Sequence, residues 1–293
     1  MTLDAALLQL AVNGAAVGAI YALVALGLVM TYKATEVLNF AYGDVLMLSA
    51  FIGWFAMTSL GLPFWAAALT AIAVAGGLSY VIDAGVMRRI VGQPHFSAVM
   101  LTIAISFMLR GLAGMMFGPT SRRLETPWSG HSSRLGGVVV ADISLAIIAA
   151  AAVVTAVLFV LLRTTRFGIG IQAASQNQLA AYLCGIRVKR LNSLVWAASG
   201  AIAAVSGVLL APLALVDISL WSVVLKAFAA LVLGGFGSMP GAVVGGVSIG
   251  LIEQFAGVYL PDGFKDVSAQ LVLILVLLCF PRGLLGEAHG RRV

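Results

Sequence analysis

Long apolar runs separated by short polar stretches dominate the chain. A helix needs about 20 apolar residues to cross the hydrocarbon core of a bilayer, which is about 30 Å thick. Most of the runs approach or reach that length, so the pattern predicts an all-α polytopic membrane protein, a helical bundle of about seven to nine transmembrane segments. The runs cover residues 7–31, 43–60, 63–87, 95–117, 139–162, 191–212, 222–236, 241–257 and 267–281.

Three stretches depart from plain spanning helices. The runs 222–236 and 241–257 are short and are joined by a Gly- and Pro-containing turn, so we expect a hairpin that either crosses twice or re-enters. Asn13-Gly14 and Gly18 interrupt the first run, as in the broken helices of some membrane proteins. The segment Leu38–Asp44 mixes aromatic, amide and acidic side chains, which predicts a half-helix or loop packed inside the protein.

Composition supports a membrane environment and excludes other classes. The chain is 61% hydrophobic and 10% charged, whereas soluble domains are about 45–50% apolar and about 25% charged. This composition excludes a soluble domain, a disordered chain and a coiled coil. The two cysteines and three histidines show no metal-ligand spacing. The net charge of +6 is explained by membrane topology, and no nucleic-acid partner is expected.

Basic residues predict the orientation. If helices alternate across the bilayer, eleven basic residues fall on one side, which the positive-inside rule makes the cytosol. This places the N-terminus outside and the C-terminus inside, and it requires an odd number of crossings: nine, or seven if the hairpin re-enters. Residues 1–293 then form a single transmembrane domain whose largest cytosolic loop is 163–190. The eleven residues are Lys33, Arg88, Arg89, Arg163, Arg166, Arg187, Lys189, Arg190, Arg282, Arg291 and Arg292.

The chain carries no recognisable catalytic or energy-supplying motif. None of its four lysines is followed by Ser or Thr, so it lacks the G-x-x-x-x-G-K-[ST] loop that binds nucleotide phosphates. It also lacks a Ser/His/Asp or Cys/His arrangement in a plausible loop. We therefore expect no enzyme, and any uphill transport takes its energy from another subunit or an ion gradient.

The middle of the 163–190 loop predicts a short amphipathic helix. Leu179, Leu183 and Ile186 lie on one face of this helix. Gln172, Ser175, Gln176 and Gln178 lie on the other. Two interpretations stay open at this point: the helix lies on lipid headgroups, or it docks a cytosolic partner.

Several ionisable groups fall within apolar runs, where charge is costly and is a functional signal by default. Asp83 and Arg110 lie near the ends of their runs and are expected to snorkel to the interface, and Glu253 to be interfacial as well. Lys226 and Asp44 are the better functional candidates, with a structural ion pair as the alternative. With Asn39 and Tyr42, they form the predicted lining or gate of a polar pathway.

Small residues recur at four-residue spacing, a pattern that lets helices pack closely. We expect them to place their helices inside the bundle. The pairs and triplet are Gly14/Gly18, Ser199/Ala203/Gly207, Gly241/Gly245 and Gly246/Gly250.

A set of motifs, in order along the whole chain, resembles the LivH-type permease of branched-chain amino-acid ABC importers. The 118–137 loop is the least diagnostic stretch. The motifs are Asn13-Gly14, Tyr21–Leu23, Ala25–Gly27, Leu38–Asp44, Arg166–Gly168, Ala173-Ala174, Gly185-Ile186, Lys226–Phe228, Leu233–Gly241, Phe264–Asp266 and Pro281–Gly286.

The resemblance implies a multi-subunit importer in the bacterial inner membrane. It implies a related LivM-type permease subunit, a periplasmic binding protein and two cytosolic ATPases, which bind ATP and Mg in place of any cofactor in this chain. It also implies an ATPase-docking loop at 163–190. The docking residues would be Ala173, Ala174, Gln176, Leu179, Leu183, Gly185 and Ile186.

The resemblance implies leucine, isoleucine and valine as substrates, although related systems carry urea, amides or aromatic acids. Two rival classes are a gradient-driven secondary transporter or channel and a membrane-embedded enzyme. The first predicts paired intramembrane carboxylates or a ring of charges, and the second a set of catalytic groups. The scarcity of buried acids favours the ABC importer.

Overall fold

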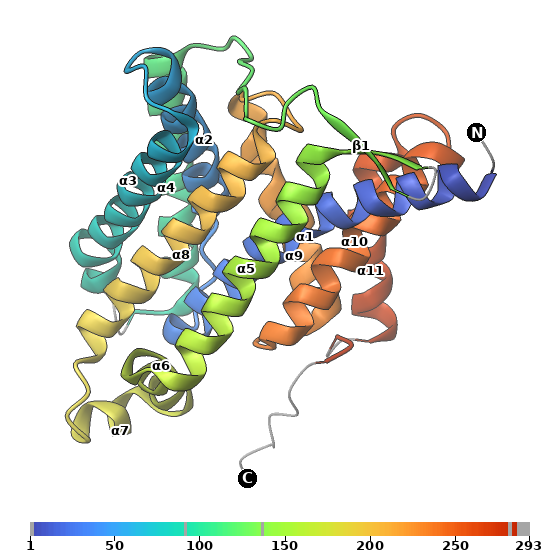
Figure 1. The fold of residues 1–293 in the computed structure, drawn as a ribbon. Helices are drawn as coiled ribbons and strands as arrows, with labels where there is room; N and C mark the ends of the chain where they lie inside the picture. The colour runs from blue at the N-terminus through green and yellow to red at the C-terminus, as the bar shows by residue number, and fades with distance from the viewer. Residues whose placement is uncertain (1–2, 91–92, 136–137, 281–282, 286–293) are drawn as a thin grey trace. The chain divides into compact units, whose positions relative to one another are not determined.

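Helices make up most of the structure, a computed structural model that describes residues 3–90, 93–135, 138–280 and 283–285 (Figure 1). Arg282, Arg291 and Arg292 of the predicted basic tail lie outside the described residues. The helices are α1 (Leu3–Thr35), α2 (Tyr42–Thr58), α3 (Phe64–Gly85), η1 (Met87–Ile90), α4 (His95–Phe117), α5 (Asp142–Thr164), α6 (Arg166–Gln176), α7 (Gln178–Leu183), α8 (Val188–Leu210), η2 (Ile218–Ser222), α9 (Val223–Gly234), α10 (Met239–Tyr259) and α11 (Phe264–Cys279).

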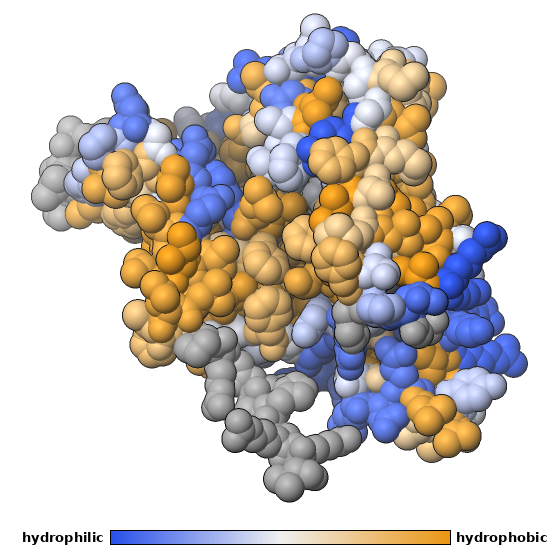
Figure 2. All heavy atoms as spheres, turned by 180° about the vertical axis from the view of Figure 1, so that it is seen from behind, coloured by the Kyte–Doolittle hydropathy of each residue, from blue (hydrophilic) through white to orange (hydrophobic). Residues whose placement is uncertain are grey.

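Six helical stretches in the described part of the chain are long and apolar enough to cross a membrane. Figure 2 shows hydrophobic residues over much of the face that it presents, which is the surface expected where lipid is the solvent. Two shorter apolar helices, Tyr42–Thr58 and Ile218–Gly234, accompany the long ones. The predicted helical polytopic class is confirmed. The six stretches are Ala6–Thr35, Phe64–Ile90, Phe96–Phe117, Asp142–Thr164, Val188–Leu210 and Met239–Tyr259.

Two local predictions about these helices are wrong. The first run is not broken, because α1 continues for 33 residues through Gly14 and Gly18. A glycine costs a helix only about 1 kcal/mol, which close packing against another helix can offset. Of the two arms predicted to be short, α9 has 12 residues, but α10 has 21 and is long enough to span.

The chain divides into two compact units. The first unit comprises Met1–Val29, Gly130–Ala151 and Leu225–Val293, and the second comprises Met30–Ser129 and Ala152–Val224. Most of α1 belongs to the first unit, together with α10 and α11. The second unit contains α2, α3, α4, α6, α7 and α8.

In the first unit, α1 and α10 pack with their backbones almost in contact. A Cβ added to Gly246 would collide with the Ala22 backbone, and one added to Gly250 would collide with the Gly18 backbone. The small residues predicted to form packing faces on these two helices therefore meet each other. Such close approach maximises dispersion contacts between helices in lipid.

In the second unit, α8 packs against both α2 and α3, and the three helices lie side by side in Figure 1. The face of α8 that carries Ser199, Ala203 and Gly207 is buried, as its small-residue spacing predicts. Trp196 on the same helix is among the largest fully buried side chains. Helix α8 is therefore the central element of this unit.

A two-stranded antiparallel hairpin in the first unit was not predicted. Strand β1 (Ser132–Leu135) pairs with β2 (Val138–Ala141), with Ser132 opposite Ala141. The second strand reads Val-Val-Val-Ala, and its β-branched residues favour strand pairing. Val139 and Val140 were predicted to belong to the next apolar run, but the helix of that run, α5, begins only at Asp142.

Candidate functional site

A buried ion pair holds the start of α2. Asp44 lies in the first turn of that helix and is fully buried. Arg110 of α4 donates from Nε to Asp44 Oδ1 at 3.0 Å and from Nη2 to Oδ2 at 3.3 Å, while the Ser106 hydroxyl donates to Oδ2. The Arg110 guanidinium also lies 3.8 Å from the centre of the Trp221 ring. Asp44 is thus paired with a cation and hydrogen-bonded through both carboxylate oxygens, as burial of a charge requires.

The segment before α2 is irregular and packed inside the protein, as its composition predicts. Asn39 is buried, and its Oδ1 accepts a hydrogen bond from the Ala41 amide at 3.1 Å. The Phe40 amide donates to Thr102 Oγ1 at 3.3 Å. Tyr42 is also buried. Protein groups therefore satisfy the non-helical backbone, which is the condition for such a segment at membrane depth.

A second buried ion pair lies in the first unit, on α9, α10 and α1. Lys226 Nζ donates to Glu253 Oε1 at 2.7 Å, and the Tyr21 hydroxyl donates to Glu253 Oε2 at 2.6 Å. Asp266 of α11 lies 3.4 Å from Lys226 Nζ, but its side chain is mostly exposed. The Lys226–Glu253 pair is the stronger interaction, because the shorter, more buried contact is less screened by solvent.

Three sequence predictions about these charges are corrected by the structure. Arg110 does not snorkel to an interface but pairs with Asp44. Glu253 is buried rather than interfacial. Asp83 is also buried and accepts a hydrogen bond from the Ser193 hydroxyl.

Lys226 and Asp44 each form an ion pair within their own unit, with Glu253 and Arg110 respectively. No role was predicted for Ser106 or Trp221, and Tyr21 was predicted only as part of a family-like motif. A hydroxyl within an apolar run was the available signal for Ser106 and Tyr21.

The 163–190 segment forms two short helices rather than one. Asn177 separates α6 from α7, and its side chain caps α7 by accepting from the Ala180 amide at 2.9 Å. Leu179 and Leu183 are 69% and 76% exposed, so their apolar face is uncovered.

The remaining predicted docking residues are divided between surface and interior. Gln176 and Gly185 are exposed, Ala173 and Ile186 are partly exposed, and Ala174 is buried. Gly185 has φ of 87°, a left-handed conformation that glycine adopts readily. Ala174 is therefore part of the packing of α6, and the uncovered surface lies on α7.

A family model described as "Branched-chain amino acid transport system / permease component" matches residues 10–280. The chain belongs to this family. The family comprises transport permeases rather than enzymes, and its matched region includes both ion pairs and the 163–190 segment.

Curated members of the permease family match the chain over nearly its full length. It is 31% identical to the high-affinity branched-chain amino acid transport system permease protein BraD of Pseudomonas aeruginosa, covering 98% of each chain. It is 30% identical to LivH of Escherichia coli K12, covering 98% of this chain and 97% of that one. The probable LivH of Methanocaldococcus jannaschii is 26% identical over 90% of this chain and 88% of its own. No solved structure matches the chain.

Proposed function

We propose that the chain is the permease subunit of an ATP-binding-cassette importer and forms the transmembrane pathway for leucine, isoleucine and valine. A periplasmic binding protein delivers these substrates, and separate ATPase subunits drive their passage. The observation that carries the proposal is the family match over residues 10–280. Relatives named as branched-chain amino acid permeases, matched nearly end to end, support the same substrates.

The ATPases dock on α7. Its exposed leucines form an apolar surface on a helix without charged residues, and such a helix suits a protein partner better than lipid headgroups. Five basic residues flank the central part of 163–190 and hold it at the membrane surface. The second membrane subunit is a related LivM-type permease.

The end of the second unit that carries α6 and α7 faces the cytosol. Arg88 donates to the Lys189 carbonyl at 3.2 Å, so two of the basic segments lie at the same end of this unit. Clustered positive charge marks the cytosolic side of a membrane protein. The N-terminus is then periplasmic and the C-terminus cytosolic in the inner membrane.

Asn39, Tyr42 and Asp44 form a gate rather than an open lining, because all three side chains are buried. Lys226 serves the same role in the first unit, held by Glu253. Closing of the ATPase dimer moves α7 and switches the pathway between its two sides. ATP can bias this equilibrium only through contacts that differ between the two states.

Reconstituted uptake tests the proposal. Proteoliposomes containing both permeases and the ATPases, supplied with the binding protein and internal ATP, should accumulate labelled leucine. Unlabelled isoleucine and valine should compete, whereas urea, simple amides and aromatic acids should not. Competition by one of the latter would reassign the substrate. Uptake driven by an ion gradient without ATPases would overturn the importer mechanism.

A further inference from the structure

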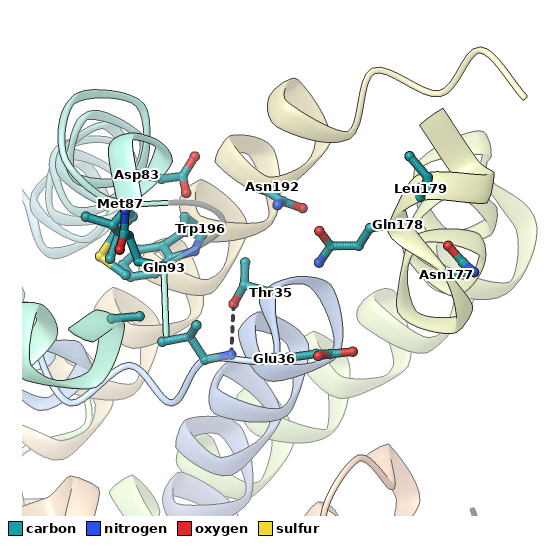
Figure 3. Close-up of a pocket in the computed structure, with 13 residues that line it drawn as sticks. Thr35, Glu36, Asp83, Met87, Gln93, Asn177, Gln178, Leu179, Asn192 and Trp196 are labelled. Carbon is teal, nitrogen blue, oxygen red and sulfur yellow. Dashed lines mark hydrogen bonds between the residues drawn. The ribbon is translucent and has the colours of Figure 1, made fainter. Parts of the chain in front are cut away.

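A cavity of about 430 Å³ lies in the second unit, between the end of α1, the η1 region, α7 and the first turns of α8 (Figure 3). Small-molecule sites typically occupy about 300–1,000 Å³, so this cavity is large enough for a metabolite. It is separate from the Asp44–Arg110 pair, neither of which lines it.

Two polar atoms on the cavity wall lack hydrogen-bond partners among the described residues. Trp196 is 2% exposed, and its Nε1 donor is unpaired. Asn192 lies one turn earlier on α8, and its buried Oδ1 acceptor is also unpaired. Buried polar groups in folded proteins nearly always find partners. A missing donor and a missing acceptor on one wall therefore point to a ligand that supplies both.

Three other polar side chains on the wall already have hydrogen-bond partners. Gln178 of α7 donates to the Ala34 carbonyl at 3.1 Å, and the Asn177 side chain caps α7 by accepting from the Ala180 amide. Asp83 accepts from Ser193. In Figure 3 the side chains of Asn192 and Gln178 extend toward each other across the space beside Thr35. These neighbours therefore do not supply the hydrogen-bond partners that Trp196 Nε1 and Asn192 Oδ1 lack.

The wall combines aliphatic and acidic groups. Its apolar residues are Val37, Met87, Ile90, Ala98 and Leu179. The carboxyl groups of Glu36 and Asp83 add negative charge. Glu36 has φ of 55°, a conformation that is uncommon outside glycine and that often marks functional segments.

We propose that this cavity binds a free aliphatic α-amino acid. The ammonium group donates to Asn192 Oδ1 and is attracted by the carboxylates of Asp83 and Glu36. The carboxylate accepts from Trp196 Nε1, and the aliphatic side chain packs against the apolar wall. Because Gln178 and Leu179 belong to α7 and Asn177 is its N-cap, the ligand contacts the segment that docks the ATPases.

This inference rests on the proposed function, which places this end of the second unit in the cytosol. The cavity is then a binding site for the transported amino acid after it has crossed the membrane. It does not depend on the binding protein, which acts from the other side. The cavity is therefore expected to bind amino acid when the binding protein is absent, and that condition separates it from delivery of substrate.

Equilibrium binding of labelled leucine to the permease–ATPase complex in lipid nanodiscs, without binding protein, tests the site. Saturable binding is expected. 4-Methylvalerate lacks the ammonium group and isopentylamine lacks the carboxylate, so each should compete at least tenfold more weakly than isoleucine. The proposal would be overturned if leucine showed no saturable binding, or if both analogues competed as strongly as isoleucine.

Two variants locate the binding. Trp196→Phe removes the donor and Asn192→Leu removes the acceptor, and each should raise the leucine Kd at least tenfold. Trp65→Phe is the matched control, because Trp65 is exposed and outside the cavity, and it should leave the Kd unchanged. Unchanged Kd in both cavity variants would mean that leucine binds elsewhere.

If the variants do not fold, photolabelling of the unaltered complex with a diazirine analogue of leucine locates the binding site. Labelling of peptides from 177–179 or 192–196 supports the site, and labelling confined to other segments overturns it. Uptake by the same complex, reconstituted in proteoliposomes with binding protein and internal ATP, separates the two claims. A complex that accumulates leucine but does not bind it without binding protein refutes only the cavity site. One that binds leucine but never accumulates it refutes only the proposed substrate.

Discussion

Buried charges in this protein occur in compensated groups at the level of single residues. Asp44 accepts two hydrogen bonds from Arg110 and one from Ser106. Glu253 accepts one from Lys226 and one from Tyr21. Such pairs contribute little net stability relative to apolar residues of similar size, but the loss of one partner leaves a charge without compensation.

Arg110→Met should therefore destabilise the second unit strongly. We expect a loss of about 3–5 kcal/mol, because Asp44 remains buried without its partner. The double variant Asp44→Asn with Arg110→Met should recover most of that loss. Thermal unfolding of the purified permease in detergent measures both. Arg123→Met is the matched control, because Arg123 is exposed. A double variant no more stable than Arg110→Met would show that the pair is not the cause.

Asn39→Leu should lower uptake while leaving assembly intact. The substitution removes the Oδ1 that accepts from the Ala41 amide, and the loss of one such bond costs about 1 kcal/mol, enough to shift a gate but not to unfold a chain. Asn39→Asp keeps an acceptor and is the control. Leucine uptake and ATPase co-purification are measured together. Unchanged uptake, or failure to assemble, would assign the segment a purely structural role.

The sequence predicted which residues were unusual better than it predicted their partners. Asp44 and Lys226 stood out because each is a charge beside or within an apolar run. Their partners lie 66 and 27 residues away in the chain, and only the packing of helices brings them together. Arg110 and Glu253 were wrongly predicted to lie at the membrane interface. The prediction used only their distance from the end of an apolar run, and this distance does not show whether a buried partner is present.

At the scale of elements, helix α1 and helix α10 meet through glycine faces. The four-residue spacing predicted that these faces pack, but it did not predict that they pack against each other. It also could not show that α1 is continuous, since glycine both breaks helices and permits close helix packing. Tertiary contact decides between these two roles.

Gly246→Val should disrupt the first unit. The added side chain would meet the Ala22 backbone, which cannot move without displacing α1. Gly77→Val is the matched control, because a Cβ at Gly77 meets nothing within 4 Å. We expect a large fall in the yield of monodisperse permease for the first variant only, measured by size-exclusion chromatography. Equal yields would mean that the two helices can separate without cost.

Leu179→Asp and Leu183→Asp should weaken ATPase retention. Truncating a well-buried anchor at an interface costs at least about 2 kcal/mol, or roughly thirtyfold in affinity, and a charge in an apolar contact costs more. Detergent co-purification and binding-protein-stimulated ATP hydrolysis measure the effect. Gln172→Asp, on the exposed polar part of α6, is the control. If the leucine variants keep full ATPase content and hydrolysis, α7 is a lipid-surface anchor.

For the whole molecule, composition and the lengths of the runs were enough to predict a helical membrane protein. They were not enough to predict the course of the 241–257 run, because residues at both of its ends extend α10 to 21 residues. The β1–β2 hairpin was missed because a short valine-rich strand and the start of an apolar helix have the same local composition.

Orientation is a prediction for the whole molecule. In a background lacking Cys184 and Cys279, single cysteines at Gln176 and Ser132 occupy exposed positions. An impermeant maleimide added to intact spheroplasts should label the cysteine at position 132 and should reach position 176 only after permeabilisation. The same labelling of both positions in intact spheroplasts would contradict the orientation.

The contact between α1 and α10 also has a consequence for biosynthesis. Tyr21 and Glu253 are 232 residues apart in the chain, and ribosomes add about 5–20 residues per second, so roughly 10–50 s separate their emergence. During that interval α1 sits in the bilayer with its glycine face uncovered and the Tyr21 hydroxyl without its carboxylate. Nascent chains are therefore most vulnerable to wrong helix pairing, and to capture by quality-control proteases, before α10 has been translated.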